Sequence, residues 1–296
     1  SGYFSGGGNY DEYFGGKSKQ KDGYGNTGAN GYDGGISIRI NGGGGGAGYI
    51  GLGNHDESPN GGIGKEINIT GENIYYSGGG GGSYSNGSVN SAGLGGLGGG
   101  AAGGLSGTLD KGFNGLSNTG GGGGGGWKFH GGNGGSGIVF IRYKKSSSKF
   151  TISNPIVKIS NDILQEVDKI QEFNYNANYV NSEEQSEYVI YFKEETTCDI
   201  LVVAGGGGGG ATDAGGGGAG GLIYETNIIL NGNCTIKVGK GGLGGTGGTN
   251  VGNNPGYKGK YSEIKGDNIS YKAIGGGGWR FWTFIRYRTS TCWRRQ

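Results

Sequence analysis

Hydrophobic and polar positions alternate over short stretches of this chain, and most of these stretches run directly into glycine. Ile36, Ile38 and Ile40 alternate with polar residues, the pattern of a strand with one buried face. Residues 138–143 and 199–204 are apolar almost throughout, and 199–204 is expected to be buried on both faces. Further short strands are expected at 67–69, 74–76, 188–192, 222–230, 235–238, 262–265 and 269–274, with a turn at 193–197.

One segment has the spacing of a helix rather than a strand. No glycine occurs between Gly137 and Gly205, and a polar stretch begins at Lys144. Beyond Ser160, apolar residues recur at intervals of three and four, which places them on one helical face. The sequence therefore predicts at most one short helix, built on Ile163, Leu164, Val167, Ile170 and Phe173.

Glycine runs organise the rest of the chain, which holds 81 glycines in 296 residues. Isolated glycine runs lose much entropy on ordering, but here they recur with the same strand flanks. A backbone without Cβ atoms can form an extended helix of the polyproline II type, with three residues per turn. Several such helices can lie side by side and pair N–H with C=O groups. The predicted fold is all-β: short strands in sandwich-like layers, continued by polyglycine II-type segments at 42–46, 78–82, 120–126, 205–210, 215–218 and 275–278.

The composition excludes a single large hydrophobic core. Apolar residues other than glycine make up 31% of the chain, against about 40% in globular proteins on the same count. The net charge is +2, and the C-terminal stretch alone carries five arginines, so the charge does not indicate a nucleic-acid partner. No apolar run approaches the roughly 18 residues of a membrane span, so no membrane insertion is expected. The chain has no Met and opens Ser1-Gly2, as a fragment or a processed product would.

The three cysteines, Cys198, Cys234 and Cys292, are an odd number that fits no closed disulfide framework. Cys198 and Cys234 each precede a predicted strand and could pair if those strands were neighbours. The alternative is that both are small, half-buried residues.

Ordered strings of residues around the glycine runs resemble a known repeat. Tyr75-Tyr76-Ser77 before 78–82, Asn118-Thr119 before 120–126, and Gly134-Gly135-Ser136-Gly137 before 138–143 are similar to the closing half of the glycine-rich repeat domain of tail-fibre and surface proteins of marine phages and giant viruses. The strings at 198–210, 219–224 and 235–242 are similar to its opening half. The resemblance brings no catalytic residues with it. Related glycine-rich phage adhesins stack polyglycine helices and bind host receptors through variable loops at their ends, and the resemblance implies the same here.

The expected domain organisation has four parts. Residues 1–143 form the closing part of one glycine-rich repeat unit, and 144–187 form a polar linker that holds the predicted helix. Residues 188–278 form the opening part of the next unit, and 279–296 form an aberrant tail.

The tail is interpreted as the product of a reading-frame shift. Trp279, Trp282 and Trp293 are three of the chain's four Trp, and the tail has five arginines but no glycine. Trp has a single codon, TGG. When this codon is read one base later, the new codon begins with GG and therefore encodes glycine, so glycine-rich sequence would continue in the neighbouring frame. The repetition of residues 140–143 at 284–287 favours a genuine closing strand instead. A shifted frame predicts a tail that does not pack, and the nucleotide sequence of this region decides between the two.

Candidate catalytic and metal chemistry is sparse. Gly16-Lys17-Ser18 imitates the end of a phosphate-binding loop, but Asp11 occupies a position that requires glycine. His55 and His130 are the only histidines, and no Cys/His cluster has zinc spacing. We therefore expect no enzyme activity, no cofactor and no metal site.

The richer chemical signal is 19 Tyr and 10 Phe in a chain with few aliphatic residues. Many lie near predicted loop tips beside Gly, Ser and Asn, which is the composition of an adaptable binding surface. The alternative is that these rings cover thin glycine layers in place of a core. The best single candidate for receptor binding is the bulky turn after 120–126, formed by Trp127, Lys128, Phe129 and His130.

These observations predict a structural, adhesive repeat of a virion tail fibre or an extracellular surface protein. Its expected partners are copies of itself in a fibre and a glycan or protein receptor on a host surface. One alternative is an ice-binding polyglycine sandwich, which needs a flat face with a strict Gly-x-x period that 93–104 breaks. Another is a low-complexity matrix protein without a specific ligand, which the alternating strands disfavour.

Overall fold

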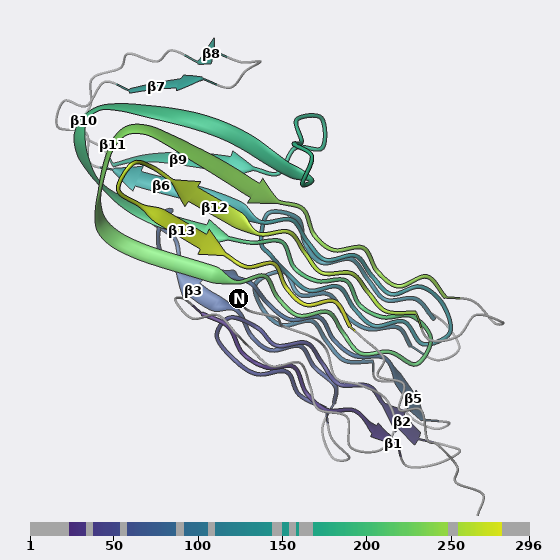
Figure 1. Cartoon of the computed structure of the whole chain (residues 1–296). Coiled ribbons are helices and arrows are strands. Elements are labelled where there is room, and N and C mark those ends of the chain that lie inside the picture. Colours follow the sequence, from purple (N-terminus) through teal and green to yellow (C-terminus); the bar gives the residue numbers. More distant parts are fainter. Residues whose placement is uncertain are drawn as a thin grey trace, which may run out of the picture.

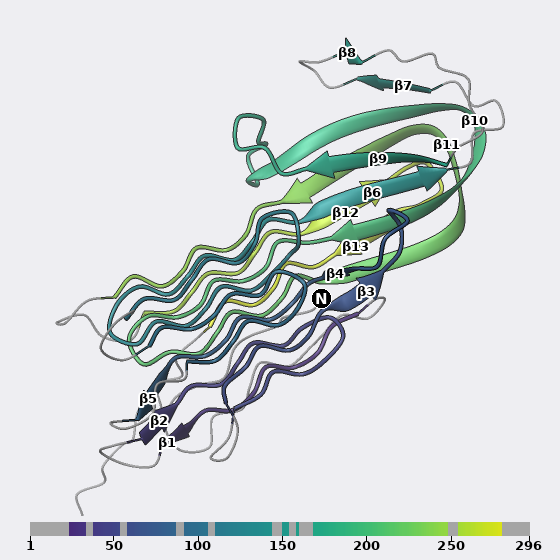
Figure 2. The ribbon, with the colours of Figure 1, turned by 180° about the vertical axis from the view of Figure 1, so that it is seen from behind.

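The apolar runs and the glycine runs of the sequence occupy opposite ends of an elongated molecule (Figures 1 and 2). The computed structural model describes residues 24–33, 38–53, 58–86, 92–105, 110–143, 150–153, 158–159, 168–247 and 254–279. Every element of regular secondary structure within these ranges is a strand, so the predicted all-β class is confirmed.

The apolar runs assemble into one eight-stranded antiparallel sheet at one end of the molecule. Its central order is β13 (Ser270–Ala273), β12 (Ser262–Lys265), β11 (Leu222–Gly239), β10 (Gln185–Val203), β6 (Ile138–Tyr143) and β9 (Lys169–Asn174). β7 (Phe150–Ser153) pairs with β10, and β8 (Lys158–Ile159) pairs with β7. β10 and β11 are long strands that bend together at the end remote from the glycine runs (Figure 1).

Two small sheets complete the described strands. β3 (Lys65–Ile67) and β4 (Ile74–Tyr76) form a hairpin near the large sheet. β1 (Tyr32–Asp33), β2 (Ile38–Ile40) and β5 (Tyr84–Asn86) form a three-stranded sheet at the far end (Figure 1).

The middle of the large sheet is buried on both faces, as the apolar run 199–204 predicts. Ile200, Val202 and the alternate residues of β6 belong to one core with β11 and β12. Leu201 and Val203 belong to a second core, which the β3–β4 hairpin covers. The alternation of side chains along a strand sends successive residues into these two cores.

The predicted helix is wrong where the structure describes its residues. Ile170 and Phe173 lie on β9, whose backbone pairs with β6 in the register Val139↔Phe173. Without β9, the backbone N–H and C=O groups on one edge of β6 would have no strand partner. The pairing of β9 with β6 therefore decides the conformation of this segment, although its side chains have helical spacing. Phe173 is buried against Tyr188 and Ile170 is exposed, which is the alternation of a strand.

The predicted turn at 193–197 is also wrong, because β10 and β11 continue through the positions where the sequence suggests breaks. The pairing shifts between Phe192 and Thr196, opposite Gly232, and again between Cys198 and Ile200. These shifts are β-bulges, which bend paired strands without ending them. Gly232 has a φ of 68°, a conformation that favours glycine at this bend.

The glycine segments pack as polyglycine II-type helices, each bonded to neighbours on several sides. Along the run 205–210 the acceptor segment repeats every third residue, as expected for three residues per turn. The N–H donors and their carbonyl acceptors are Gly205 to Lys260, Gly206 to Gly135, Gly207 to Gly218, Gly208 to Tyr257, Gly209 to Gly132 and Gly210 to Gly215. The carbonyls of the run accept from three further segments, 276–279, 242–245 and 123–126. The run is therefore the centre of a hexagonal arrangement.

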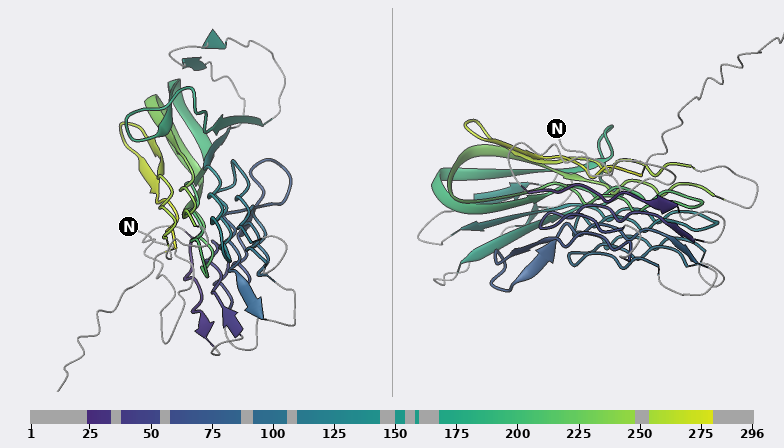
Figure 3. Two further views of the ribbon diagram at one scale, coloured as in Figure 1. Left: turned by 90° about the vertical axis from the view of Figure 1, so that its right-hand side faces the viewer. Right: turned by 90° about the horizontal axis from the view of Figure 1, so that it is seen from below.

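These hydrogen bonds arrange the segments in layers, which the views in Figure 3 show from the side and from below. We call the whole arrangement the glycine lattice. Its outer layer consists of 110–116, 130–136 and 240–247, and the layer beneath consists of 98–103, 120–126, 205–210 and 254–260. The third layer consists of 92–97, 78–83, 214–221 and 275–278, and the fourth of 42–47 and 58–64. Segments 24–30 and 48–53 bond to the far side of the fourth layer.

Glycine is required inside this lattice because a neighbouring backbone occupies the space of a side chain. A Cβ atom at Gly207 would collide with the carbonyl of Gly277, and one at Gly123 with the carbonyl of Gly132. The two glycine-rich parts of the chain share the lattice, since Gly123 donates its N–H directly to Gly207.

Cys198 and Cys234 are free and fully buried. They lie on neighbouring strands, but Cys198 faces Ile228 and Cys234 faces Ile190. The alternative of two small, unbridged residues is therefore confirmed, but both are fully rather than half buried. Burial raises the pKa of the Cys198 thiol to about 12 and that of Cys234 to about 11, so neither is a nucleophile near neutral pH.

The prediction that the tail does not pack is wrong for its first residue, Trp279. It is fully buried, and its N–H reaches the carbonyl of Gly208 at 3.1 Å. Several other predictions fall outside the described residues: the aromatics before residue 24, the Gly16-Lys17-Ser18 string, Ile36, His55, residues 160–167 of the predicted helix, Cys292 and the tail beyond 279.

Candidate functional site

The turn 127–130 lies at the end of the lattice away from the large sheet. It joins the run 120–126 to residues 131–137, which lead back into β6. The N–H groups of Trp127, Lys128 and Phe129 all point to the carbonyl of Asp110, at 2.8, 3.3 and 3.3 Å. One carbonyl thus holds the backbone of the turn in place.

The four predicted binding residues divide into one anchor and three exposed side chains. Trp127 is only 9% exposed, and its carbonyl accepts the N–H of Asp213 at 2.6 Å. Trp127 therefore anchors the turn and offers little surface to a receptor. Lys128, Phe129 and His130 are exposed, Phe129 at 40%.

A neighbouring turn at 211–214 supports this end of the molecule. Thr212 donates its N–H to the carbonyl of Phe129 at 3.3 Å. Thr212 and Asp213 have φ values of 57° and 52°, which are uncommon for residues other than glycine, above all for a β-branched one. The strained turn and the turn 127–130 hold each other through their backbones.

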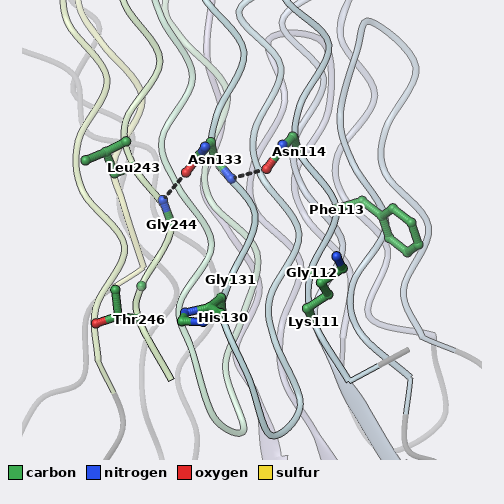
Figure 4. Close-up of a pocket in the computed structure, with 11 residues that line it drawn as sticks. Lys111, Gly112, Phe113, Asn114, His130, Gly131, Asn133, Leu243, Gly244 and Thr246 are labelled. Atoms are coloured by element: carbon green, nitrogen blue, oxygen red, sulfur yellow. Dashed lines mark hydrogen bonds between the residues drawn. The ribbon is translucent and has the colours of Figure 1, made fainter. Parts of the chain in front are cut away.

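A groove of about 520 Å³ begins beside His130 on the outer layer. Figure 4 shows its lining residues on three parallel segments, with Lys111 and Phe113 on one side, His130 and Asn133 in the middle, and Leu243 and Thr246 on the other. The groove follows the direction of the segments because glycines between these side chains leave a hollow.

Polar side chains on the floor of the groove bond to the backbone of neighbouring segments (Figure 4). Asn133 Oδ1 accepts the N–H of Gly244 at 2.8 Å, and the N–H of Asn133 reaches Asn114 Oδ1 at 2.8 Å. His130 Nδ1 accepts the N–H of Gly247 at 3.2 Å. His130 and Asn133 are one helical turn apart, about 9 Å at 3.1 Å per residue. These side chains satisfy outward N–H groups of the outer layer and are fixed in position by doing so.

A second groove, of about 540 Å³, lies on the other side of Leu243, which lines both. Its side chains include Glu184, Tyr257 and three lysines, Lys240, Lys258 and Lys260. We call it the lysine groove. The exposed face of the lattice therefore combines amides, an imidazole, aromatic rings and ammonium groups, which suit a hydroxylated or anionic ligand.

The sequence points to the turn and misses the groove residues. Asn114, Asn133 and Lys240 belong to segments far apart in the chain, and only lattice pairing brings them together. A signal was present in the three-residue spacing of polar or large residues between glycines, as at Leu243 and Thr246.

Neither metal-ligand clusters nor membrane-spanning helices occur in the part of the chain that the structure describes. No group of three or more His, Cys, Asp or Glu residues there is arranged to hold a metal ion. The same ranges contain no helix with the length and apolar character of a membrane span.

The described residues thus form a polyglycine lattice that ends in loops and grows out of an antiparallel sheet. A family described as the glycine-rich domain matches residues 1–144 and 182–292. The chain belongs to this glycine-rich domain family. The match includes Trp279 and most of the tail, and leaves out 145–181. Neither the curated proteins nor the solved structures contain a match to the chain.

Proposed function

We propose that this chain is an adhesive, structural repeat of a virion tail fibre or an extracellular surface protein, and that it attaches to a host surface through the turn 127–130. The observation that carries the proposal is the position of this turn: three exposed side chains, Lys128, Phe129 and His130, stand at the free end of a lattice of paired backbones. A preorganised loop loses little entropy on binding.

The strain in the adjoining turn supports the same assignment. Thr212 and Asp213 both hold left-handed φ values, and such residues cluster at binding sites, where the surrounding structure maintains them. Here they fix the backbone against Phe129.

The test is a glycan array probed with the labelled chain, alongside a variant in which Lys128, Phe129 and His130 become Ser, Gly and Ser. Trp127 is kept because it is an anchor. We expect the variant to fold as the parent does, by circular dichroism, and to lose array binding. The matched control carries Glu72→Ser and Asn73→Ser in the exposed β3–β4 turn at the opposite end, and it should bind normally. Unchanged binding by the first variant would remove the turn from the site.

The fibre part of the proposal requires contact between copies, and we place that contact on one edge of the lattice. Neighbouring segments there expose Ile63, Leu94, Leu97, Phe113 and Leu116. The segments 58–64, 92–103 and 112–118 contain no charged residue, so two copies can meet without like-charge repulsion. Replacing Leu94 and Leu97 with Ser should abolish self-association in sedimentation velocity, whereas Leu243→Ser on the outer layer should not. Equal association of all three proteins would contradict this contact.

The ice-binding alternative ranks lower on the same observation. Leu94 and Leu97 follow a three-residue period, but the neighbouring outward residues differ in size, as Ile63 and Phe113 do. A flat, repeating surface is therefore lacking on this edge. Thermal hysteresis of the purified chain would reverse the ranking.

A further inference from the structure

The lysine groove contains more positive charge than its own residues neutralise. Among its lining residues, Lys240 and Lys260 share a single glutamate, which leaves one positive charge of this pair in surplus. Lys240 Nζ lies 3.2 Å from Glu184 Oε1, and Lys260 Nζ lies 3.1 Å from Glu184 Oε2. A single carboxylate thus bridges two ammonium groups, one through each oxygen.

Glu184 also has an unusual backbone conformation. Its φ is 58°, in the left-handed region, which is uncommon for a residue with a side chain. Asn181 maintains the turn: its carbonyl accepts the N–H of Glu184 at 3.0 Å, and its Oδ1 accepts the N–H groups of Glu183 and Gln185 at 3.0 and 3.1 Å. The turn therefore fixes the backbone from which the Glu184 side chain reaches the two lysines.

The groove also offers an apolar surface beside the charges. Tyr257 is 63% exposed and lies on the same segment as Lys258 and Lys260. An exposed tyrosine ring provides a flat face at low cost in conformational entropy, which suits a sugar ring. Leu243 lines both this groove and the one in Figure 4, so the two grooves adjoin.

We propose that the lysine groove binds an anionic polysaccharide, with a sulfate or carboxylate group taking the place of the Glu184 carboxylate between Lys240 and Lys260. Tyr257 packs against the sugar ring that carries the anionic group. Glu184 competes with the ligand for the two lysines. The inference rests on the proposed role in attachment and specifies the chemistry of the ligand.

The probe is fluorescein-labelled dextran sulfate, with uncharged dextran of the same length as its neutral counterpart. Binding to the whole chain is measured by fluorescence anisotropy in low salt, where charge interactions are least screened. We expect binding of dextran sulfate only. The double variant Lys240→Gln with Lys260→Gln should weaken it at least tenfold, and Glu184→Gln should strengthen it severalfold because the lysines lose their internal partner.

The matched control carries the same loss of charge on exposed lysines elsewhere, Lys193→Gln with Lys265→Gln, and should bind within twofold of the parent. Equal weakening by both double variants would show general charge attraction and would overturn the site. Weaker binding of the Glu184→Gln variant would also overturn the site, because Glu184 would then not compete with the ligand. Binding of uncharged dextran as tightly as dextran sulfate would overturn the anionic ligand. Labelled alginate, which carries carboxylates, distinguishes the two anionic groups. A preference for either polymer is consistent with the site. If neither polymer binds, the site is excluded.

Failure of the lysine groove can be distinguished from failure of the turn 127–130. A variant that lacks Lys128, Phe129 and His130 side chains retains the lysine groove and should bind dextran sulfate as the parent does. If that variant keeps dextran sulfate binding but the parent shows no array binding that depends on the turn, the proposed attachment by the turn fails and the groove stands. If the double lysine variant binds normally, the groove fails and the turn is unaffected.

Discussion

The sheet end and the glycine lattice of this molecule bury different groups. In the sheet, side chains such as Ile200 and Ile236 are fully buried and pack against residues of other strands. In the lattice, the runs 120–126 and 205–210 bury backbone atoms, whose N–H and C=O groups pair with neighbouring segments. The comparison teaches that one chain can be ordered by hydrophobic burial in one place and by backbone pairing in another.

The two regions therefore respond to substitution in opposite ways. A hydrophobic core is weakened by removing atoms, because a cavity remains. The lattice is weakened by adding them, because the space of each inner Cβ already holds a neighbouring carbonyl.

The largest effect is expected for Gly207→Val. Its side chain would collide with the backbone of Gly277 and Gly278 and would separate the segments that Gly207 joins. The expected loss is at least about 4 kcal/mol, at the upper end for a point substitution and enough to unfold a protein of typical stability. Gly123→Val should behave alike. Denaturant unfolding followed by circular dichroism measures both.

Thr246→Val is the control within the same lattice. Thr246 is exposed on the outer layer, so its replacement should change stability by no more than about 0.5 kcal/mol. Melting of the Gly207→Val variant at the parent's temperature would mean that the glycine runs do not pack laterally.

A smaller effect is expected for Ile200→Ala in the sheet. Ile200 is fully buried, and the lost transfer free energy and the cavity together cost about 3 kcal/mol. Ile200→Val should cost about 1 kcal/mol.

The sharper test is Gly207→Ala, which adds one methyl group to the lattice and should cost more than Ile200→Ala. The reverse order would remove the contrast between the regions.

The next effect concerns the polar network where the sheet meets the β3–β4 hairpin. Asp199 Oδ2 accepts from Arg142 Nη2 at 2.6 Å and from Nε at 3.1 Å, and Asp199 Oδ1 accepts the N–H of Asn227 at 3.0 Å. Asp199→Ala should destabilise the protein by about 2 kcal/mol, as expected for hydrogen bonds to charged groups. Asp199→Asn keeps an oxygen for Asn227 and should cost less. Equal stability of both variants and the parent would show that the network contributes nothing.

The smallest effect is a pH dependence of stability at Glu184. Hydrogen bonds from Lys260, which has the largest effect, and from Lys240 lower the pKa of its carboxyl group. A lowered folded-state pKa means that the stabilisation is present above the ordinary value of about 4.3 and is lost as the pH falls through the folded-state value. Because the side chain is half exposed, the loss should be only a few tenths of a kcal/mol. Thermal melts between pH 6 and pH 3 should differ between the parent and Glu184→Gln by this amount and no more.

Glu184 does not titrate alone. Its immediate neighbour Glu183 accepts a hydrogen bond from Tyr261, which lowers the pKa of that carboxyl group as well. The comparison with Glu184→Gln removes this common contribution. A parent and a variant with identical pH profiles would mean that the two lysine contacts do not contribute to stability.

The sequence predicts the buried strands and the glycine packing well, because both have local signatures. Nearly continuous apolar residues mark β6 and 199–204, and the glycine runs leave few arrangements that satisfy their backbones. The helix fails because the spacing of Ile170 and Phe173 fits either a helical face or a partly exposed strand, and only the free edge of β6 decides. The turn at 193–197 fails because its polar residues look like a loop, although β11 resumes pairing at Thr196 and Thr197 after the bulge.

The candidate site is predicted only in its local part. The turn 127–130 stands out by its bulk after a glycine run, yet the backbone of Trp127 is held by Asp110 and Asp213 from other segments. The three-residue spacing at Leu243 and Thr246 marks outward-facing residues, but it does not show which residues share a groove, because Asn133 and Gly244 are 111 positions apart and Glu184 and Lys240 are 56 apart. Their pairing follows from the register of the whole lattice.

The burial of peptide groups in the lattice has a consequence for heat capacity. Exposure of apolar surface raises the heat capacity on unfolding, whereas exposure of polar surface lowers it. A region that buries mostly N–H and C=O groups should therefore unfold with a smaller heat-capacity change per residue than the usual value of about 12–15 cal/mol/K. Its stability curve is then flatter, so the lattice should lose little stability on cooling or on moderate heating.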